Sequence, residues 1–333
     1  MTVEIIAELA QGFEGRPEQA RLLLKAAAAA GADAAKYQLV YADELATPDY
    51  KYYELFKSLE MPDEVWSGLA EYAGELGIQL QVDIFGTRSL ALAAKIGVAA
   101  VKLHGTDIAN VGLLNQVAAS SMKRVLLGAG GAHLSELQRA IDVLSAKDVV
   151  VLLGFQGYPT PSDANQIARV RLLSERLAKT HPMVTIGFAD HAQPESSLRS
   201  ALATMAMGAG ATVLEKHLTM GKIMKLEDHE SALNPDEFLE FTQTIRACSQ
   251  ALGVAIDCED FGMSESERGY RKMIRRHVVA SRNLEAGVVV SPSDLTLKRT
   301  SADLVITDLS SVYRKTIKRG VQMNTPISPP DIA

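Results

Sequence analysis

The chain has few cysteines, few aromatic residues and no excess of basic charge. Cys248 and Cys258 are the two cysteines in 333 residues, which fits a reduced protein better than a disulfide framework. The formal net charge is −6 and the pI is near 5.7, which argues against a general nucleic-acid binder. No apolar run reaches membrane-spanning length, and we expect no signal peptide at the start. These absences predict a cytoplasmic protein that binds neither nucleic acid nor membrane, and they do not exclude small anionic substrates.

Short apolar runs alternate with helical patterns along most of the chain. The strand-like runs are Val3–Leu9, Ala34–Leu39, Ile78–Ile84, Val98–Leu103, Arg124–Gly128, Val149–Phe155, Val184–Phe188 and Thr212–Lys216. The helical patterns are Arg16–Ala30, Asp63–Leu76, Thr87–Ile96, Asn110–Ser120, Leu134–Leu144, Asn165–Thr180, Glu195–Gly208 and Pro235–Leu252. This order predicts a (β/α)₈ barrel, the TIM barrel. A doubly wound open sheet is the alternative, but the turn at residues 10–15 lacks its glycine-rich fingerprint.

The pattern changes after the last helix. Residues 257–274 are polar and charged and read as a linker, while 275–333 contain short strands and turns. We therefore expect a barrel domain over 1–256, a linker over 257–274 and a small β-rich domain over 275–333. A domain of this size has a marginal core, so we expect it to dock on another surface.

Two of the apolar runs end in a histidine, His191 and His217. In neighbouring parallel strands of a barrel these residues lie at the same ends, where two imidazoles can hold one divalent cation. Asp190, Glu215 and Asp228 are close in sequence. A hydrogen-bonded structural role for each histidine stays open at this point.

Other polar residues also occur at the strand ends, where barrel active sites form. They are Glu8, Lys36, Gln38, Asp83, Lys102, His104, Gln156, Tyr158, Asp190, Glu215 and Lys216. Lys36 and Lys102 would bring positive charge over the barrel mouth and favour a phosphate or carboxylate ligand. An ion pair of Lys36 with Glu8 is the alternative.

Several of these residues occur in longer motifs. They are Ile6-Ala7-Glu8, Lys36-Tyr37-Gln38, Tyr158-Pro159-Thr160-Pro161, Asp190-His191, Glu215-Lys216-His217-Leu218-Thr219 and the run from Asp228 to Phe238. In this order they resemble the sialic acid synthase family, which includes spore coat polysaccharide synthesis proteins. The tail, with Arg275–Ala280 and Leu297-Lys298-Arg299, is similar to that family's C-terminal antifreeze-like (SAF) domain.

The resemblance implies an enzyme that condenses phosphoenolpyruvate with an N-acylated aminosugar to a nine-carbon 2-keto acid. It implies Mn²⁺ or Mg²⁺ on His191 and His217, and a domain-swapped homodimer. The catalytic residues expected are Glu8, Lys36, Lys102, Asp190 and Asp228. The substrate-binding residues expected are Gln38, Asp83, Gln156, Tyr158, Glu215, Lys216 and Arg299, the last reaching the partner's sugar.

The chain also departs from the family pattern. Hydroxyl-bearing motifs of the family are replaced by residues 81–85, 105–107 and 128–131, so hydroxyls expected to hold phosphate are absent. Glycine backbone N–H groups are a substitute. Two alternatives therefore remain, a metal-dependent sugar-acid aldolase or lyase that does not use phosphoenolpyruvate, and a catalytically decayed sugar-binding relative.

Overall fold

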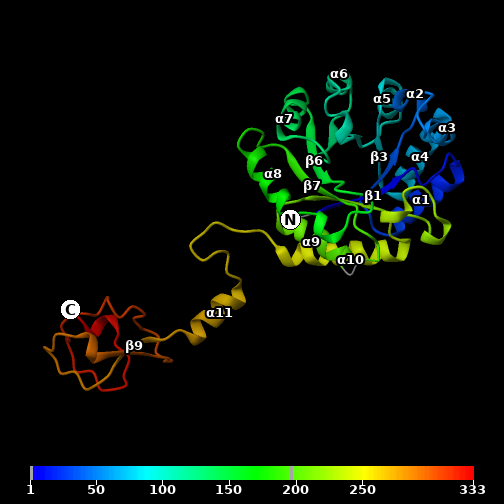
Figure 1. The fold of residues 1–333 in the computed structure, drawn as a ribbon. Helices are drawn as coiled ribbons and strands as arrows, with labels where there is room; N and C mark the ends of the chain where they lie inside the picture. The colour runs from blue at the N-terminus through cyan, green and yellow to red at the C-terminus, as the bar shows by residue number, and fades with distance from the viewer. Residues whose placement is uncertain (1–2, 196–197) are drawn as a thin grey trace. The chain divides into compact units, whose positions relative to one another are not determined.

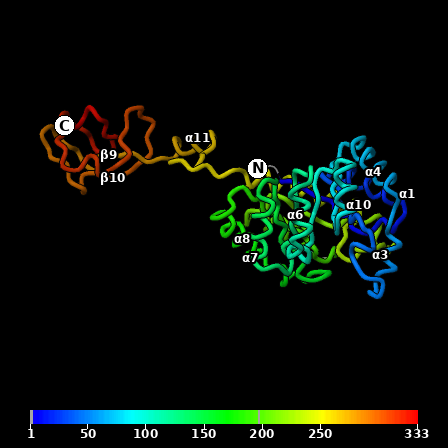
Figure 2. The backbone as a smooth tube through the Cα atoms, turned by 90° about the horizontal axis from the view of Figure 1, so that it is seen from above, coloured from blue at the N-terminus to red at the C-terminus, as the bar shows by residue number. Residues whose placement is uncertain are grey.

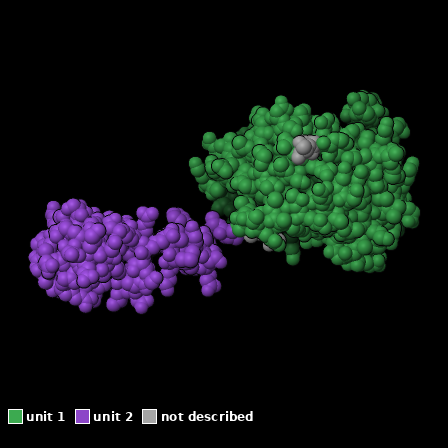
Figure 3. All heavy atoms as spheres, turned by 90° about the horizontal axis from the view of Figure 1, so that it is seen from below, with its two compact units in different colours: residues 1–253 green, residues 254–333 purple. Residues whose placement is uncertain are grey.

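A computed structural model describes residues 3–195 and 198–333. The chain forms two compact units, Met1–Gly253 and Val254–Ala333 (Figure 3). Each unit has its own hydrophobic core. The residues expected to form a linker, 257–274, include helix α11, Glu265–Ile274.

The first unit is a closed barrel of parallel strands β1 to β8 among the described residues. Their bounds are β1 Glu4–Ala10, β2 Ala34–Gln38, β3 Gln79–Asp83, β4 Ala100–Leu103, β5 Arg124–Gly128, β6 Asp148–Gly154, β7 Thr185–Asp190 and β8 Val213–His217. Each strand pairs with the next, and β8 pairs with β1. The prediction of a TIM barrel is confirmed, and the open sheet is excluded.

Helices surround the strands (Figure 1). They are α1 Pro17–Ala29, α4 Asp63–Leu76, α5 Thr87–Ile96, α6 Val111–Ala119, α7 Leu134–Val143, α8 Ala168–Ala178, α9 Arg199–Gly208 and α10 Pro235–Leu252. Helices α6 and α7 lie side by side (Figures 1 and 2). Part of the helix expected over Glu195–Gly208, residues 196–197, lies outside the described residues. Two short helices between β2 and α4 were not expected, α2 Ala42–Leu45 and α3 Tyr53–Leu59.

The barrel has an inner and an outer apolar layer because side chains alternate along each strand. A small inner cluster fills the barrel and contains Ile6, Ala34, Ala100, Leu126, Val150, Leu152, Ala189 and Val213. A much larger cluster lies between the strands and the helices. Residues one position away from an inner residue therefore face the helices. None of the helices in the described ranges is both long and apolar enough to cross a membrane.

The second unit contains helix α11 and a small antiparallel sheet of β9, His277–Ala280, and β10, Leu295–Lys298. Its core includes Val278, Leu284, Val290, Val312, Ile317, Val321 and Ile327. The prediction of a small β-rich C-terminal domain is confirmed.

This unit contains one structural motif twice. Ser291-Pro292-Ser293-Asp294 and Ser328-Pro329-Pro330-Asp331 each form a short 3₁₀ turn. In both, the aspartate accepts a 2.8 Å hydrogen bond from the serine N–H and one from the Nε of an arginine, Arg282 or Arg319. Counted from the arginine, the copies span 282–294 and 319–331. They meet at Leu284 and Val321, whose backbones exchange N–H···O bonds of 2.8 Å in both directions.

Candidate active site

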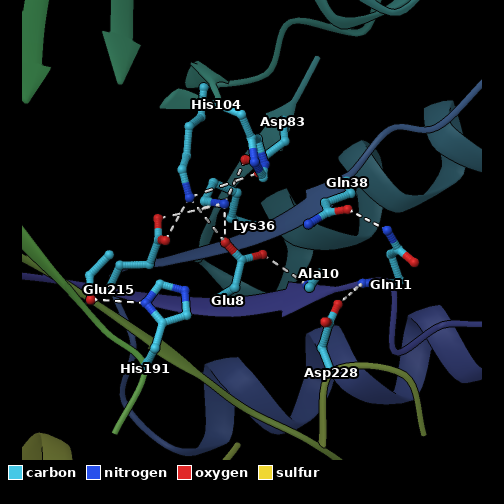
Figure 4. A network of polar contacts seen from close by, with 12 residues as sticks. Glu8, Ala10, Gln11, Lys36, Gln38, Asp83, His104, His191, Glu215 and Asp228 are labelled. Atoms are coloured by element: carbon cyan, nitrogen blue, oxygen red, sulfur yellow. Dashed lines mark hydrogen bonds and ion pairs between the residues drawn. The ribbon is translucent and has the colours of Figure 1, made fainter. Parts of the chain in front are cut away.

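Five charged side chains from five strands meet in the barrel mouth. Glu8 comes from β1, Lys36 from β2, Asp83 from β3, Lys102 from β4 and Glu215 from β8. The strand register explains the meeting, since Glu8 lies opposite Lys36 and Asp83 opposite Lys102. Figure 4 shows four of them, Glu8, Lys36, Asp83 and Glu215, pointing toward one another. All are buried, with Lys36 and Asp83 fully enclosed.

The two lysines are already paired with carboxylates. Lys36 Nζ donates to Glu8 and, at 2.6 Å, to Asp83 Oδ1. Lys102 Nζ donates to Glu215 Oε1 at 2.7 Å and lies 3.7 Å from Glu8 Oε2. The side chain of Lys102 keeps 9% of its surface exposed, whereas that of Lys36 has none. Lys102 is therefore the lysine of the pair that an entering anion can reach.

The carboxylates of this cluster have different proton affinities. Burial raises the pKa of Glu8 to about 8 against the opposing effect of Lys36. Burial also acts to raise the pKa of Asp83 and of Glu215, but the neighbouring lysines outweigh it and hold both pKa values below their ordinary range. Asp83 and Glu215 are thus ionised at neutral pH, and Glu8 is the carboxyl of the three that takes up a proton most readily.

The two histidines lie next to this cluster. The ring centroids of His191 and His217 are 5.2 Å apart, with an angle of 60° between the ring planes. Burial lowers the pKa of His191 to about 4 and lowers that of His217 well below its usual value. Both imidazoles are therefore neutral at physiological pH, the form that binds metals.

The ring nitrogens of the two histidines could hold a divalent cation. His191 Nδ1 lies 3.1 Å from the carbonyl oxygen of Ala189, a contact that makes Nδ1 the donor and leaves Nε2 free as a ligand. Within the described residues, the His217 ring makes aromatic contacts but no hydrogen bond, and Glu215 Oε2 is buried without a hydrogen-bond partner. No cluster of three or more His, Cys, Asp or Glu suited to a metal occurs in the same residues. The protein thus offers two nitrogen ligands, and water or substrate would complete the shell.

A polar rim lies beside the histidines. Tyr158 OH donates to the carbonyl oxygen of Asp228 at 2.6 Å, and its ring contacts His217 at 5.8 Å between centroids. Asp228 Oδ2 accepts a 3.3 Å hydrogen bond from Gln11 N, and Gln11 Nε2 donates to Gln38 Oε1 at 2.7 Å. Burial raises the pKa of Asp228. Gln38, Tyr158 and Asp228, which the sequence predicted as site residues, therefore lie together in this rim.

The remaining expected site residues lie elsewhere. Asp190 and Lys216 are each one position away from an inward-facing residue, and they pair with each other behind the barrel wall. Gln156 turns to the following loop, where its Nε2 donates to Asn165 O at 3.3 Å. Arg299 belongs to the second unit, is exposed, and its Nε donates to Ile274 O at 3.2 Å.

Two residues, His104 and Phe155, contact the site residues more closely than the sequence indicated. His104 Nε2 lies 2.6 Å from Asp83 Oδ2 and extends the charged cluster, as its position after β4 could have suggested. Phe155 is 60% exposed, has a φ of 59° and places its ring 5.6 Å from that of His191. No sequence signal marked Phe155, because it reads as the end of an apolar strand. A positive φ is uncommon for a bulky residue, so the backbone at Phe155 is strained.

Comparisons of the chain with protein families, with curated proteins and with solved structures agree with one another. The family model described as the NeuB family matches residues 23–257, and the SAF domain matches residues 275–333. Uncharacterized protein MJ1065 of Methanocaldococcus jannaschii is 31% identical over 94% of this chain and 90% of its own length. N,N'-diacetyllegionaminic acid synthase of Legionella pneumophila is 28% identical over 98% of this chain and 93% of its own. The solved structure of a spore coat polysaccharide biosynthesis protein E from Chromobacterium violaceum superposes with a TM-score of 0.82 over 100% of both chains at 23% identity, a similarity of fold.

Proposed function

Because this chain belongs to the NeuB family, we propose that it condenses phosphoenolpyruvate with an N-acylated aminosugar to a nine-carbon, sialic-acid-like 2-keto acid. The observation that carries the proposal is the convergence of a charged cluster and two neutral histidines in one barrel mouth. The similarity to an N,N'-diacetyllegionaminic acid synthase supports the product class. The acceptor sugar itself is left open.

In this reaction His191 and His217 would hold a divalent cation, Mn²⁺ or Mg²⁺, through ring nitrogens. The cation, when bound, polarises the aldehyde carbonyl of the open-chain sugar. Burial lowers the pKa of both imidazoles and keeps them neutral. The contact of His191 Nδ1 with the carbonyl oxygen of Ala189 fixes the orientation of the His191 ring.

Lys102 receives the phosphoenolpyruvate anion, since its ammonium is the more exposed of the two. The N–H groups of Gly130 and Gly131, which donate no hydrogen bond to other described residues, are candidates for the phosphate in place of the missing hydroxyls. C3 of phosphoenolpyruvate then forms the new bond to the aldehyde carbon, whose oxygen takes up a proton. Water adds to C2 with loss of its proton, and the C2–O bond breaks to release phosphate. Glu8, the carboxyl of the cluster whose pKa is raised, is the candidate proton donor.

The rim residues Gln38, Tyr158 and Asp228 would bind the hydroxyl groups of the sugar. We further propose a two-fold, cytoplasmic homodimer in which the second unit of one protomer covers the barrel mouth of its partner. Arg299, an exposed guanidinium, would then reach the N-acyl group of the partner's sugar.

One observation favours a second candidate, a metal-dependent sugar-acid aldolase or lyase that does not use phosphoenolpyruvate. Lys36 is fully enclosed by Glu8 and Asp83, so it has no free face for an anion. The choice is tested by incubating the full chain with phosphoenolpyruvate, Mn²⁺ and a panel of N-acyl aminosugars. Sugar-dependent release of phosphate supports the synthase. A sugar acid cleaved to pyruvate, without phosphate release from phosphoenolpyruvate, supports the aldolase.

A further inference from the structure

A buried ion pair lies directly behind the two histidines. Lys216 precedes His217 on β8, and Asp190 precedes His191 at the end of β7. Both side chains face the helices rather than the barrel mouth, yet Lys216 is completely buried and Asp190 is 2% exposed. Neither group can therefore contact a substrate in the mouth directly.

The pair holds the backbone on both sides of His191. Lys216 Nζ donates to Asp190 Oδ1 at 3.2 Å and to the carbonyl oxygen of Ala192 at 3.0 Å. Asp190 Oδ1 also accepts the N–H of Ala192 at 2.8 Å. The Lys216 side chain, next to His217, thus fixes Asp190 and Ala192, the residues before and after His191.

The same segment is fixed from two further loops. The carbonyl oxygen of His191 accepts hydrogen bonds from Thr160 N at 2.8 Å and from Ser231 Oγ at 2.9 Å. Side chains or backbone groups from three elements therefore fix the position of His191. The Lys216 side chain is the one that adds to the backbone pairing of β7 with β8, whose register places Asp190 opposite Lys216.

A buried ion pair is seldom the most stable solution at such a place, because apolar residues of similar size are often as stable or more so. Here Asp190 Oδ2 has no hydrogen-bond partner among the described residues, so the pair is not even fully satisfied. Stability alone does not account for it. We propose that Lys216 is a positioning residue that, with Asp190, sets the spacing of His191 and His217. The proposal rests on the metal-binding role given to these histidines above.

The test uses the double variant Lys216→Met with Asp190→Asn, which leaves no unpaired buried charge and retains an acceptor for the Ala192 N–H. In the metal-free full chain, hydrogen–deuterium exchange should accelerate in the segment 190–192, while exchange in the rest of the barrel stays as in the wild type. Affinity for Mn²⁺, measured by electron paramagnetic resonance, should fall about 10- to 100-fold, the usual effect of losing an outer-shell partner. The KM for phosphoenolpyruvate should stay unchanged.

Lys222→Met is the matched control, since Lys222 also forms an ion pair, with Glu237 at 3.1 Å, but contacts neither histidine segment. If the double variant does not fold, Lys216→Gln with Asp190→Asn, which also leaves no unpaired buried charge, decides by the same two measurements. Unchanged exchange at 190–192 together with unchanged Mn²⁺ affinity would overturn the proposal. If the wild type binds no Mn²⁺, the metal chemistry proposed above fails, and exchange alone then decides whether Lys216 positions His191.

Discussion

Protonation of Glu8 should control the binding of phosphoenolpyruvate. The Glu8 carboxyl lies between the two lysines, with Oε2 3.7 Å from Lys102 Nζ and in contact with Lys36. Burial raises its pKa to about 8. Below that pH it is neutral and no longer competes with an anionic substrate for Lys102, whose remaining carboxylate partners are Glu215 and Asp83. Above it the carboxylate repels the anion and competes for the ammonium, so affinity should fall as pH rises.

The size of the effect follows from the pKa. If the substrate binds only when Glu8 is protonated, the apparent Kd is multiplied by roughly 1.1 at pH 7, about 2 at pH 8 and about 11 at pH 9. The difference between pH 7 and pH 9 is thus about tenfold, or ~1.4 kcal/mol. The substrate adds no titration of its own, because the second pKa of a phosphate ester is about 6.

Isothermal titration of phosphoenolpyruvate into the metal-free protein measures this directly. Buffers of different ionisation enthalpy at pH 8 should report uptake of about half a proton per bound anion. The Glu8→Gln variant, neutral at every pH, should bind with constant affinity across the same range. Equal wild-type affinities at pH 7 and pH 9, or the same slope in the variant, would refute the reasoning.

Four further outcomes are expected. Lys102→Met should raise the KM for phosphoenolpyruvate about 30-fold or more and that for the sugar far less, because loss of a buried charge contact costs about 2–5 kcal/mol; similar changes in both KM values would contradict this. His217→Ala should weaken Mn²⁺ binding by more than roughly 100-fold in equilibrium dialysis without unfolding the barrel; unchanged affinity would remove His217 from the metal site. Gly154→Ala should lower thermal stability by about 1–3 kcal/mol, because the new Cβ would lie 2.4 Å from Ala189 O, whereas Gly208→Ala, with open space around it, should not. Truncation after Asp260 should abolish sugar-dependent turnover and retain metal binding, and a fully active monomer would exclude the swapped dimer.

The barrel was predictable because its strands and helices have strong local signals. Helices α4 and α5 begin and end at the expected residues, 63–76 and 87–96. Helices α2 and α3 were missed because they are too short for a periodic pattern to identify. Their position depends on contacts distant in sequence, such as the 2.9 Å hydrogen bond from Ala42 N to the Glu60 carboxylate.

The site was predictable at the level of strand ends, but not of side-chain direction. Adjacent residues such as Asp190 and His191, or Lys216 and His217, were assigned to one site. Side chains on a strand alternate, so members of each pair point to opposite sides of the barrel wall. The alternation was available in the sequence, whereas the enclosure of Lys36 by two carboxylates depends on the register of three strands.

The repeated turn motif of the second unit has a consequence for its evolution. Its two copies, 282–294 and 319–331, use the same serine, proline and aspartate positions and the same kind of arginine partner. Their reciprocal bonds at Leu284 and Val321 reproduce within one chain the contact that two identical peptides would form about a two-fold axis. Residues 282–331 therefore have the form of two similar peptides joined in one chain, and substitutions in either copy must keep the shared turn chemistry if the two are to stay paired.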